Sequence, residues 1–263
     1  MPRPILEARN LKLRYPFRPN PLAPAQGWVQ AVSGVSLALQ AGESVGLVGE
    51  SGCGKSTLSR LLCGLIPPDE GEILFEGQPL LKLNSRDWKR FRQSVQLIFQ
   101  DPMASLNPLM RIGDAIAEPL KIHGLASGSS LDQEVASKLE EVGLDPAWAH
   151  RRPSQLSGGQ RQRVGIARAL SLKPQVLICD EPVSSLDLSV QSQILKLLTE
   201  LRQKRGLTLL FISHSLRTVG ALADRMLVMH SGQIVEEGTN PELFRSPQHA
   251  YTQVLVKLAT ERL

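Results

Sequence analysis

The sequence predicts an α/β fold in which a mostly parallel sheet carries helices on both faces and a helical lobe interrupts the chain. Short apolar runs, typical of buried parallel strands, alternate with amphipathic helical segments. A glycine-rich loop follows one of these runs and directly precedes a helix. The stretch 100–163 is rich in helix formers and has no strong strand pattern, so it is expected to form the inserted lobe.

The composition fits one large domain, because 42% of the 263 residues are hydrophobic and can bury a full core. A net charge of +5 leaves nucleic acid or an anionic membrane surface open as partners. The densest basic cluster consists of Lys89, Arg90 and Arg92. Short charge runs of this kind are usually solvated helix faces, so the charge alone identifies no partner.

Two further properties bear on the compartment. Cys53, Cys63 and Cys179 stand at no metal-ligand spacing, and an odd number of cysteines suits a reduced, cytosolic compartment. The N-terminal residues lack the apolar core of a signal peptide, and no apolar run approaches the ~20 residues of a membrane helix. We therefore expect a soluble chain that would reach a membrane only through a partner.

The first third of the chain is expected to be strand-rich. Residues 5–15 and 32–39 alternate apolar and polar side chains, which predicts two half-buried strands. The four prolines within 16–30 predict a loop between them. The other elements expected before residue 100 are strands at 44–48, 71–75 and 95–99 and a helix at 55–65.

Helices are expected within the inserted lobe, and strands and helices alternate again after it. One of the later helices has a clear apolar face, formed by Ile194, Leu197, Leu198 and Leu201. The expected helices are 112–122, 131–142, 188–203 and 216–222, and the expected strands are 176–179, 207–212 and 225–228.

Residues 49–57 match the pattern G-x-x-x-x-G-K-[S/T] between a strand and a helix. Glycines allow backbone N–H groups to curl around phosphate oxygens, and the helix directs its positive end at them. Lys55 would reach the β- and γ-phosphates, and the Ser56 hydroxyl would bind Mg²⁺. A chance glycine turn is the alternative, which the strand–loop–helix context disfavours. The expected nucleotide-binding residues are Gly49, Glu50, Ser51, Gly52, Cys53, Gly54, Lys55, Ser56 and Thr57.

Asp180 and Glu181 directly follow an apolar strand, so both carboxylates are expected at the C-terminal edge of the sheet, where open α/β folds bind ligands. Asp180 could bind Mg²⁺, and Glu181 could polarise the water that attacks a γ-phosphate. An acidic helix cap would be the simpler explanation if the pair stood alone. Together with the phosphate loop, the pair indicates a phosphate-loop NTPase.

The segment Leu156-Ser157-Gly158-Gly159-Gln160 resembles the signature of the ABC ATPase family. Ser157 is placed to cap a helix, and the two glycines would expose its first N–H groups, which makes a second anion site. An ordinary N-cap is the alternative, but the position of the segment between the two phosphate motifs favours the signature. In this family two subunits pack head to tail, so Ser157, Gly158, Gly159 and Gln160 would close over the ATP of the other subunit.

Four more residues match motifs of the same family in the expected order. Gln100 looks like the Q-loop glutamine, which senses the γ-phosphate and can contribute to the Mg²⁺ site. Asp187 ends a segment that looks like the D-loop. His214 resembles the switch histidine, which holds the γ-phosphate and positions Glu181. Tyr15 resembles the aromatic residue that stacks on adenine, although an exposed aromatic at a strand end is the alternative.

The resemblance covers essentially the whole chain and implies a single ABC ATPase domain over residues 1–263. A RecA-like phosphate-loop NTPase core with an antiparallel β lobe would comprise 1–99 and 164–263, and 100–163 would form the helical signature subdomain. ATP and Mg²⁺ would be the ligands. A second ATPase subunit, identical or different, and two membrane-spanning permease subunits would be the partners, with an extracytoplasmic solute-binding protein acting indirectly. No nucleic acid partner is expected, and the chain would lie peripherally on the cytoplasmic face of the inner membrane.

Within the family, several segments resemble the dipeptide, oligopeptide and nickel import branch. They are the phosphate loop, residues 99–102 and 104–108, and the tail 246–252, in which Ala250 replaces a proline. Peptide-branch ATPases are commonly longer, and this short tail resembles that of the smaller nickel-import ATPase. The sequence therefore favours nickel or a metal chelate as cargo, with a di- or oligopeptide as the alternative.

Other classes of function fit the motifs less well. A soluble ABC ATPase of DNA maintenance would separate the phosphate motifs by a long coiled coil, and one of translation would carry two cassettes. The 99–108 segment argues against an exporter. A binding-only module would have lost catalytic residues, whereas Lys55, Asp180, Glu181 and His214 are all present.

Overall fold

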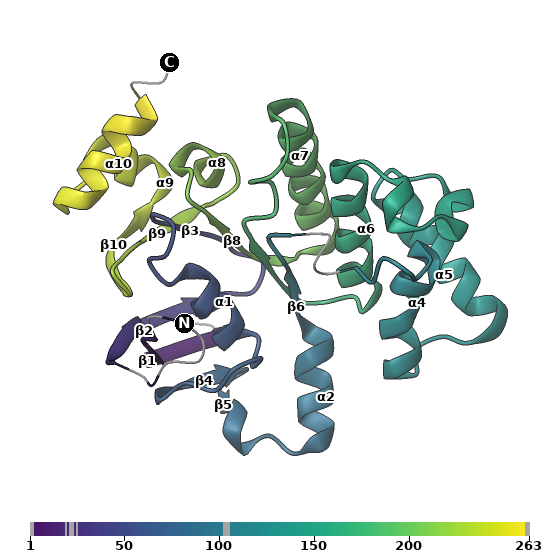
Figure 1. Ribbon diagram of the computed structural model, residues 1–263, viewed down its shortest axis with the longest axis horizontal. Helices are drawn as coiled ribbons and strands as arrows, with labels where there is room; N and C mark the ends of the chain where they lie inside the picture. Colours follow the sequence, from purple (N-terminus) through teal and green to yellow (C-terminus); the bar gives the residue numbers. More distant parts are fainter. Residues whose placement is uncertain (1–2, 19, 21–23, 25, 102–105, 261–263) are drawn as a thin grey trace. The chain divides into compact units, whose positions relative to one another are not determined.

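The computed structural model describes residues 3–18, 20, 24, 26–101 and 106–260 (Figure 1). The chain forms two compact units. The first consists of Met1–Asn84 and Leu210–Leu263, and the second of Ser85–Leu209. The sequence predicts a different division, with a core of 1–99 and 164–263 and a helical subdomain of 100–163. That division is based on the functional parts of the family and not on compactness, and it stays a prediction.

The first unit contains an antiparallel sheet and a second group of strands. Its elements are β1 (Leu6–Pro16), β2 (Trp28–Leu39), β3 (Ser44–Val48), α1 (Lys55–Leu62), β4 (Glu70–Phe75), β5 (Gln78–Pro79), a 3₁₀ turn at Leu80–Lys82, α8 (Leu216–Gly220), β9 (Arg225–His230), β10 (Gln233–Thr239), α9 (Asn240–Arg245) and α10 (Ala250–Thr260). The sheet has the order β2-β1-β4-β5, which is the antiparallel lobe that the family resemblance implies. Strand β3 pairs with β9 in parallel, and β9 pairs with β10 antiparallel.

The second unit is mainly helical around one pair of parallel strands. Its elements are α2 (Ser85–Ser94), β6 (Val95–Ile98), α4 (Ile112–His123), α5 (Gly128–Glu141), 3₁₀ turns at Pro146–His150 and Pro153–Gln155, α6 (Gly158–Ser171), β7 (Val176–Asp180) and α7 (Leu188–Arg205). Strand β6 pairs with β7 in parallel, with Val95 opposite Val176. Helices α4, α5 and α6 pack against one another (Figure 1). Strand β8 (Thr208–Ser213) contains the boundary between the units.

Every strand and helix expected from the sequence is present, but the bounds of some needed correction. The expected loop at 16–30 was wrong at its end, because β2 begins at Trp28 and pairs Trp28 with Pro16 and Gln30 with Arg14. The expected helix at 55–65 was too long, because α1 ends at Leu62 and Gly64 adopts a positive φ of 63°. Residues 19, 21–23 and 25 of the expected loop lie outside the described part of the chain.

The basic cluster of the sequence lies on the surface of one helix. Lys89, Arg90 and Arg92 are exposed on α2, as a solvated helix face requires. Across the residues that the structure describes, no helix combines the length and the apolar composition that crossing a bilayer requires.

The three thiols differ in their exposure, and none is in a disulfide. Cys53 and Cys179 are buried, and burial raises the pKa of both thiols. For Cys179 the adjacent Asp180 carboxylate raises the pKa further. Cys63, at the C-terminal end of α1, is only partly buried.

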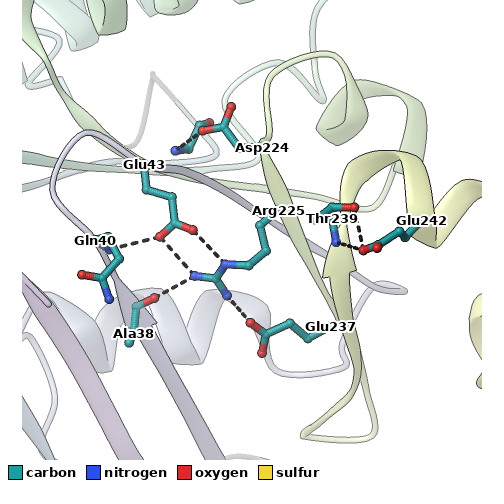
Figure 2. Close-up of polar contacts among 9 residues, drawn as sticks. Ala38, Gln40, Glu43, Asp224, Arg225, Glu237, Thr239 and Glu242 are labelled. Atoms are coloured by element: carbon teal, nitrogen blue, oxygen red, sulfur yellow. Dashed lines mark hydrogen bonds and ion pairs between the residues drawn. The ribbon is translucent and has the colours of Figure 1, made fainter. Parts of the chain in front are cut away.

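The first residue of β9, Arg225, joins three segments of the first unit through its guanidinium group (Figure 2). It donates to the two carboxylate oxygens of Glu43 at 2.8 and 3.2 Å and to the carbonyl oxygen of Ala38 at 2.8 Å. It also forms an ion pair with Glu237 of β10. This network therefore fastens the β2–β3 turn to the β9–β10 pair.

The Glu43 carboxylate at the centre of this network has a lowered pKa. Its partial burial acts to raise the pKa, but hydrogen bonds from Arg225 and from the backbone N–H of Gln40 act in the opposite direction and outweigh burial. Hydrogen bonds that favour the charged form of a carboxyl group have this effect. The Glu43–Arg225 pair is therefore an ionic contact at neutral pH.

Candidate functional site

The phosphate loop connects a buried strand to a helix, as the sequence predicts. All five residues of β3 are buried, and the loop residues Gly49 to Gly54 lead directly into α1 at Lys55. Gly54 occupies the N-cap position of α1 with φ 110°, in the left-handed region that favours glycine. The loop thus presents the N-terminal end of α1, where backbone N–H groups and the helix dipole favour an anion.

Two glycines allow the loop to lie directly against neighbouring backbone. A Cβ atom on Gly49 would lie 2.2 Å from the carbonyl oxygen of Met229, and one on Gly54 would lie 2.1 Å from that of Ala31. A side chain at either position would therefore displace the loop from β9 or β2. The residues present fit a phosphate group, because the narrow curve of this loop depends on positions where a Cβ does not fit.

Lys55 lies over the loop and is 4% exposed. Its Nζ donates to the carbonyl oxygens of Gly49 and Glu50, at 2.8 Å in each case. These contacts fix the ammonium group on the inner side of the loop. A cation held there offsets the negative charge of a phosphate chain. Ser56 and Thr57, which follow in the first turn of α1, are partly buried.

Tyr15, expected to stack on adenine, lies near the end of β1 opposite Val29 of β2 and is 41% exposed. Two further aromatic residues, Phe17 and Trp28, are exposed at the same end of the β1–β2 pair. The Arg14 guanidinium lies 4.7 Å from the centre of the Trp28 ring. Sequence reasoning had not assigned Phe17 or Trp28 to the site, because 16–30 was expected to be a loop.

His214 directly follows strand β8 and is exposed in the turn before α8. Two serines build this turn. The Ser215 backbone N–H donates to Ser213 Oγ at 3.1 Å, and Ser215 Oγ caps α8 by accepting from the N–H of Thr218. The turn thus holds the histidine at the end of a buried strand, in the position that the sequence predicts.

In the second unit, Asp180 is the last residue of β7 and Glu181 follows it at once. Both residues are buried, with Asp180 5% exposed and Glu181 8% exposed. Glu181 has φ 47°, a left-handed conformation that is uncommon for residues other than glycine. The following turn is fixed by Ser184, whose Oγ donates to the Glu181 carbonyl oxygen at 3.1 Å.

Gln100 and Glu181 are brought together, although 81 positions separate them in the sequence. The Gln100 Nε2 donates to Glu181 Oε2 at 3.3 Å. The pairing of β6 with β7 explains this proximity, because Gln100 follows β6 and Glu181 follows β7 at the same edge of the strand pair. Of the nearby segment 99–108, residues 102–105 lie outside the described part of the chain, while Leu106 is buried.

The signature segment begins α6, and Ser157 is its N-cap as expected. Ser157 Oγ accepts from the N–H of Gln160 at 3.3 Å, and the Gln160 side chain accepts from the N–H of Ser157 at 2.9 Å. Gly158 and Gly159 form the first turn. A Cβ on Gly159 would lie 2.4 Å from Cγ1 of Val190, so this glycine allows α6 to approach α7 closely.

Asp187 has a structural task that the sequence prediction had not included. It is the N-cap of α7, and its Oδ1 accepts from the backbone N–H of Val190 at 2.9 Å. Because Val190 also contacts Gly159, the cap lies close to the beginning of α6. The D-loop-like segment also lies next to the signature within the second unit, because a Cβ on Gly158 would be 3.2 Å from Cδ2 of Leu186.

The donor set for a metal ion is sparse within the described residues, which contain no cluster of three or more His, Cys, Asp or Glu side chains of the kind that holds a metal ion. The expected Mg²⁺ ligands are Ser56, Gln100 and Asp180, which offer a hydroxyl, an amide oxygen and one carboxylate. Ser56 belongs to the first unit and Gln100 and Asp180 to the second, and each offers the kind of oxygen ligand that Mg²⁺ prefers beside water and substrate phosphates.

Two contacts of the loop had no signal in the sequence. The Tyr251 hydroxyl of α10 accepts a hydrogen bond from the backbone N–H of Glu50 at 2.8 Å. His230 Nδ1 lies 3.2 Å from Glu50 Oε1. Both partners belong to the last part of the chain, far from residue 50 in sequence.

The chain is similar in sequence and fold to known ATP-binding proteins of transport systems. A sequence profile of the ABC transporter family matches residues 32–184. The chain is 49% identical over 229 residues to the oligopeptide transport ATP-binding protein OppF of Haemophilus influenzae. The aligned residues cover 87% of this chain and 69% of that protein. It is 45% identical over 260 residues to the dipeptide transport ATP-binding protein DppF of Escherichia coli, covering 99% and 77%.

Two further similarities extend the comparison. The chain is 47% identical over 253 residues to the glutathione import ATP-binding protein GsiA of Pectobacterium atrosepticum, covering 96% of this chain and 41% of that protein. Among solved structures, the dimeric ATP-binding cassette MJ0796 bound to ADP and Pi superposes with a TM-score of 0.78 at 27% identity. That superposition covers 89% of this chain and 98% of the cassette.

Proposed function

The chain belongs to the ABC transporter family, and from this premise we propose that it is the ATP-hydrolysing subunit of an importer of di- or oligopeptides. The observation that carries the proposal is the phosphate loop. It lies between the fully buried β3 and the helix α1, and Lys55 is held over it. The identity of 49% with a protein named for oligopeptide transport supports the choice of cargo.

Each residue that the sequence assigned to the nucleotide has a defined task in this proposal. Backbone N–H groups of the phosphate loop would bind the phosphates, and Lys55 would offset their charge. Tyr15 would stack on the adenine ring, and His214 would donate to the γ-phosphate. The Ser157–Gln160 signature and Asp187 would act on the ATP that a second subunit binds.

Glu181 would orient and polarise the attacking water as a general base, and Gln100 would help to position it. The hydrogen bond from Gln100 Nε2 supports this assignment, because it holds the Glu181 carboxylate in one orientation. When Mg²⁺ is bound, it supplies charge neutralisation at the phosphates, and Ser56, Gln100 and Asp180 would be its protein ligands. Catalysis would then rest on positioning and charge stabilisation, with no covalent intermediate on the protein.

The proposed assembly follows the family. Two ATPase subunits, identical or different, would pair head to tail and work on two membrane-spanning permease subunits at the cytoplasmic face of the inner membrane. An extracytoplasmic solute-binding protein would deliver the cargo. The similarity to a dimeric cassette bound to ADP and Pi supports the pairing of ATPase subunits.

The cargo preference differs from the one that the sequence suggested. The short tail favoured nickel or a metal chelate, whereas the relatives described above are named for oligopeptide, dipeptide and glutathione transport. The di- or oligopeptide alternative therefore has the stronger support. Nickel stays a second candidate only because the tail resembles that of the smaller nickel-import ATPase.

A complementation experiment separates the two cargoes. A strain that lacks this protein would receive the parent chain, Glu181→Gln, or Glu200→Gln, which changes an exposed glutamate of α7. Uptake of a radiolabelled tripeptide and cellular nickel content would be measured in each strain. We expect tripeptide uptake to be restored by the parent and by Glu200→Gln, and not by Glu181→Gln.

The outcomes discriminate clearly. If the parent chain restores the cellular nickel content and tripeptide uptake does not change in any strain, nickel and not a peptide is the cargo. Equal restoration of tripeptide uptake by Glu181→Gln and the parent would exclude Glu181 as the general base. No change of either cargo in the deletion strain would rule out both import functions.

A further inference from the structure

The last part of the chain forms three contacts with the phosphate loop, all within the first unit. The backbone N–H of Glu50 donates to the Tyr251 hydroxyl at 2.8 Å, and His230 Nδ1 lies 3.2 Å from Glu50 Oε1. The third contact is between Gly232, in the β9–β10 turn, and the loop carbonyl of Cys53, which accepts its N–H at 3.0 Å. The loop is thus fastened at two of its residues.

The two side chains that contact Glu50 also support each other. The rings of His230 and Tyr251 are 4.2 Å apart between centres, with an angle of 33° between their planes. Burial raises the pKa of the Tyr251 phenol, so its oxygen is the uncharged hydroxyl acceptor at neutral pH. The pair therefore presents a fixed acceptor to one backbone N–H of the loop.

The position of Tyr251 is itself fixed from β10. The Glu236 carboxylate accepts from the backbone N–H groups of Gln248 and His249, at 2.8 and 2.9 Å. The N–H of Tyr251 in turn donates to His249 Nδ1 at 3.2 Å. These bonds hold the beginning of α10, so the tyrosine is placed by the backbone around it and not only by its own packing.

We propose that Tyr251, supported by His230, is a positioning residue that fixes the first half of the phosphate loop and thereby strengthens ATP binding. The inference rests on the proposed ATPase function. A loop that wraps phosphate groups with backbone N–H donors binds more tightly when its backbone is held in the bound shape beforehand. The hydroxyl of Tyr251 restrains the loop at Glu50. The carbonyl oxygen of the same residue accepts a hydrogen bond from Lys55 Nζ.

The test compares Tyr251→Phe, which keeps the ring stacked on His230 and removes only the hydroxyl, with the parent. Amide hydrogen exchange at Glu50 reports on the loop without any nucleotide. Calorimetric titration with MgATP and steady-state ATPase kinetics of the assembled transporter report on binding and turnover. We expect about tenfold faster exchange at Glu50 and a Kd and KM for MgATP about 3- to 10-fold higher, with kcat unchanged.

Arg217→Ala is the matched control. Arg217 Nε donates to the carbonyl oxygen of Ala259 at the other end of α10, so this variant loosens the helix without removing the Tyr251 hydroxyl. It should leave the Kd for MgATP at the parental value. Amides of β3 and β9 serve as internal references, because both strands lie in the same unit and should exchange as in the parent if the variant is folded.

Three results would overturn the inference. The first is an amide exchange rate at Glu50 in Tyr251→Phe that equals the parental rate. The second is faster exchange at Glu50 in Tyr251→Phe with an unchanged Kd for MgATP. The third is a rise of the Kd for MgATP in Arg217→Ala that is as large as the rise in Tyr251→Phe. Failure of the proposed ATPase function has a different signature, which is no MgATP binding by the parent chain. In that case exchange at Glu50 still decides whether Tyr251 restrains the loop.

Discussion

Glu181 combines an uncommon backbone conformation with a nearly buried carboxyl group. Its φ of 47° lies in the left-handed region, where residues other than glycine are held at a free-energy cost of about 1–3 kcal/mol. The bond from Ser184 Oγ to its carbonyl oxygen and the bond from Gln100 to its side chain maintain this state. A conformation that the surroundings must impose is typical of residues whose placement matters for chemistry.

The phosphate loop offers a pair of glycines that separates backbone strain from steric conflict. Gly52 has φ 84° and open space where a Cβ would stand, whereas Gly54 has φ 110° and the Ala31 carbonyl oxygen only 2.1 Å from that Cβ. We expect Gly52→Ala to lower the free energy of unfolding by about 1–2 kcal/mol through strain alone. Gly54→Ala should lower the free energy of unfolding by at least about 3 kcal/mol, because the steric conflict adds to the backbone strain. Urea denaturation measures both, and equal losses would contradict the steric argument.

Asp187 allows the cap of α7 to be tested apart from any contact with nucleotide. Asp187→Asn keeps a side-chain oxygen that can accept from the Val190 N–H, whereas Asp187→Ala loses the cap. We expect the free energy of unfolding of the alanine variant to be about 1 kcal/mol lower than that of the parent. The asparagine variant should have the same free energy of unfolding as the parent. Thermal unfolding followed by circular dichroism measures the difference. Equal stability of the alanine variant and the parent would show that the cap is not needed.

At the scale of whole elements, the parts of the fold that a local pattern specifies were predictable. Strands β3 and β7 are buried along their full length and appear in the sequence as continuous apolar runs. The pattern of 49–57 determines the loop between β3 and α1. In contrast, β10, α9 and α10 were not predicted, because Gln233–Thr239 alternates poorly and Ala250–Thr260 is stabilised by contacts with distant residues such as Arg217.

The site shows the same division between local and long-range information. Lys55, Asp180 and Ser157 stand where their motifs place them, because strand, loop and helix are consecutive in the chain. The contact between Glu50 and Tyr251 joins residues 201 positions apart, and no periodicity or spacing encodes it. Trp28 was missed for a related reason, because its strand position depends on pairing with Pro16 across a proline-rich segment.

The attachment of β9 to the β2–β3 turn should depend on pH. The folded pKa of Glu43 lies below its ordinary value of 4.5, so this carboxyl stabilises the fold fully above about pH 4.5 and loses that contribution as the pH falls through the folded pKa. We expect Glu43→Gln to lower the free energy of unfolding by about 2 kcal/mol near pH 7, and the difference from the parent to shrink below about pH 4.5. Urea denaturation over this pH range measures it.

Glu140→Gln, which changes an exposed residue of α5, is the control for Glu43→Gln and should follow the parent over the whole pH range. A difference between Glu43→Gln and the parent that grows toward acidic pH would contradict the stated sign. It would mean that the folded pKa of Glu43 is raised.

At the scale of the whole molecule, the proposed mechanism requires two chains for one complete reaction cycle. If hydrolysis opens the pair, Glu181→Gln should stop turnover and trap the ATP-bound dimer. We expect ATPase activity to fall by at least about 100-fold. Light scattering coupled to size-exclusion chromatography in MgATP should then show a dimer for Glu181→Gln.

Lys55→Ala, which removes the ammonium group from the phosphate loop, is the control for this experiment and should stay monomeric under the same conditions. A monomeric Glu181→Gln chain that binds MgATP would contradict ATP-driven pairing of identical subunits. It would direct the search to a different second ATPase subunit.

The uneven exposure of the three thiols has a practical consequence for studying this cycle. Cys53 and Cys179 are shielded, and their raised pKa values keep little reactive thiolate at neutral pH. Cys63 is the most accessible of the three and directly follows Leu62, the last residue of the helix that begins with Lys55. A maleimide fluorophore should therefore attach selectively to the native chain at Cys63, without engineered substitutions, and give a spectroscopic probe of the helix that follows the phosphate loop.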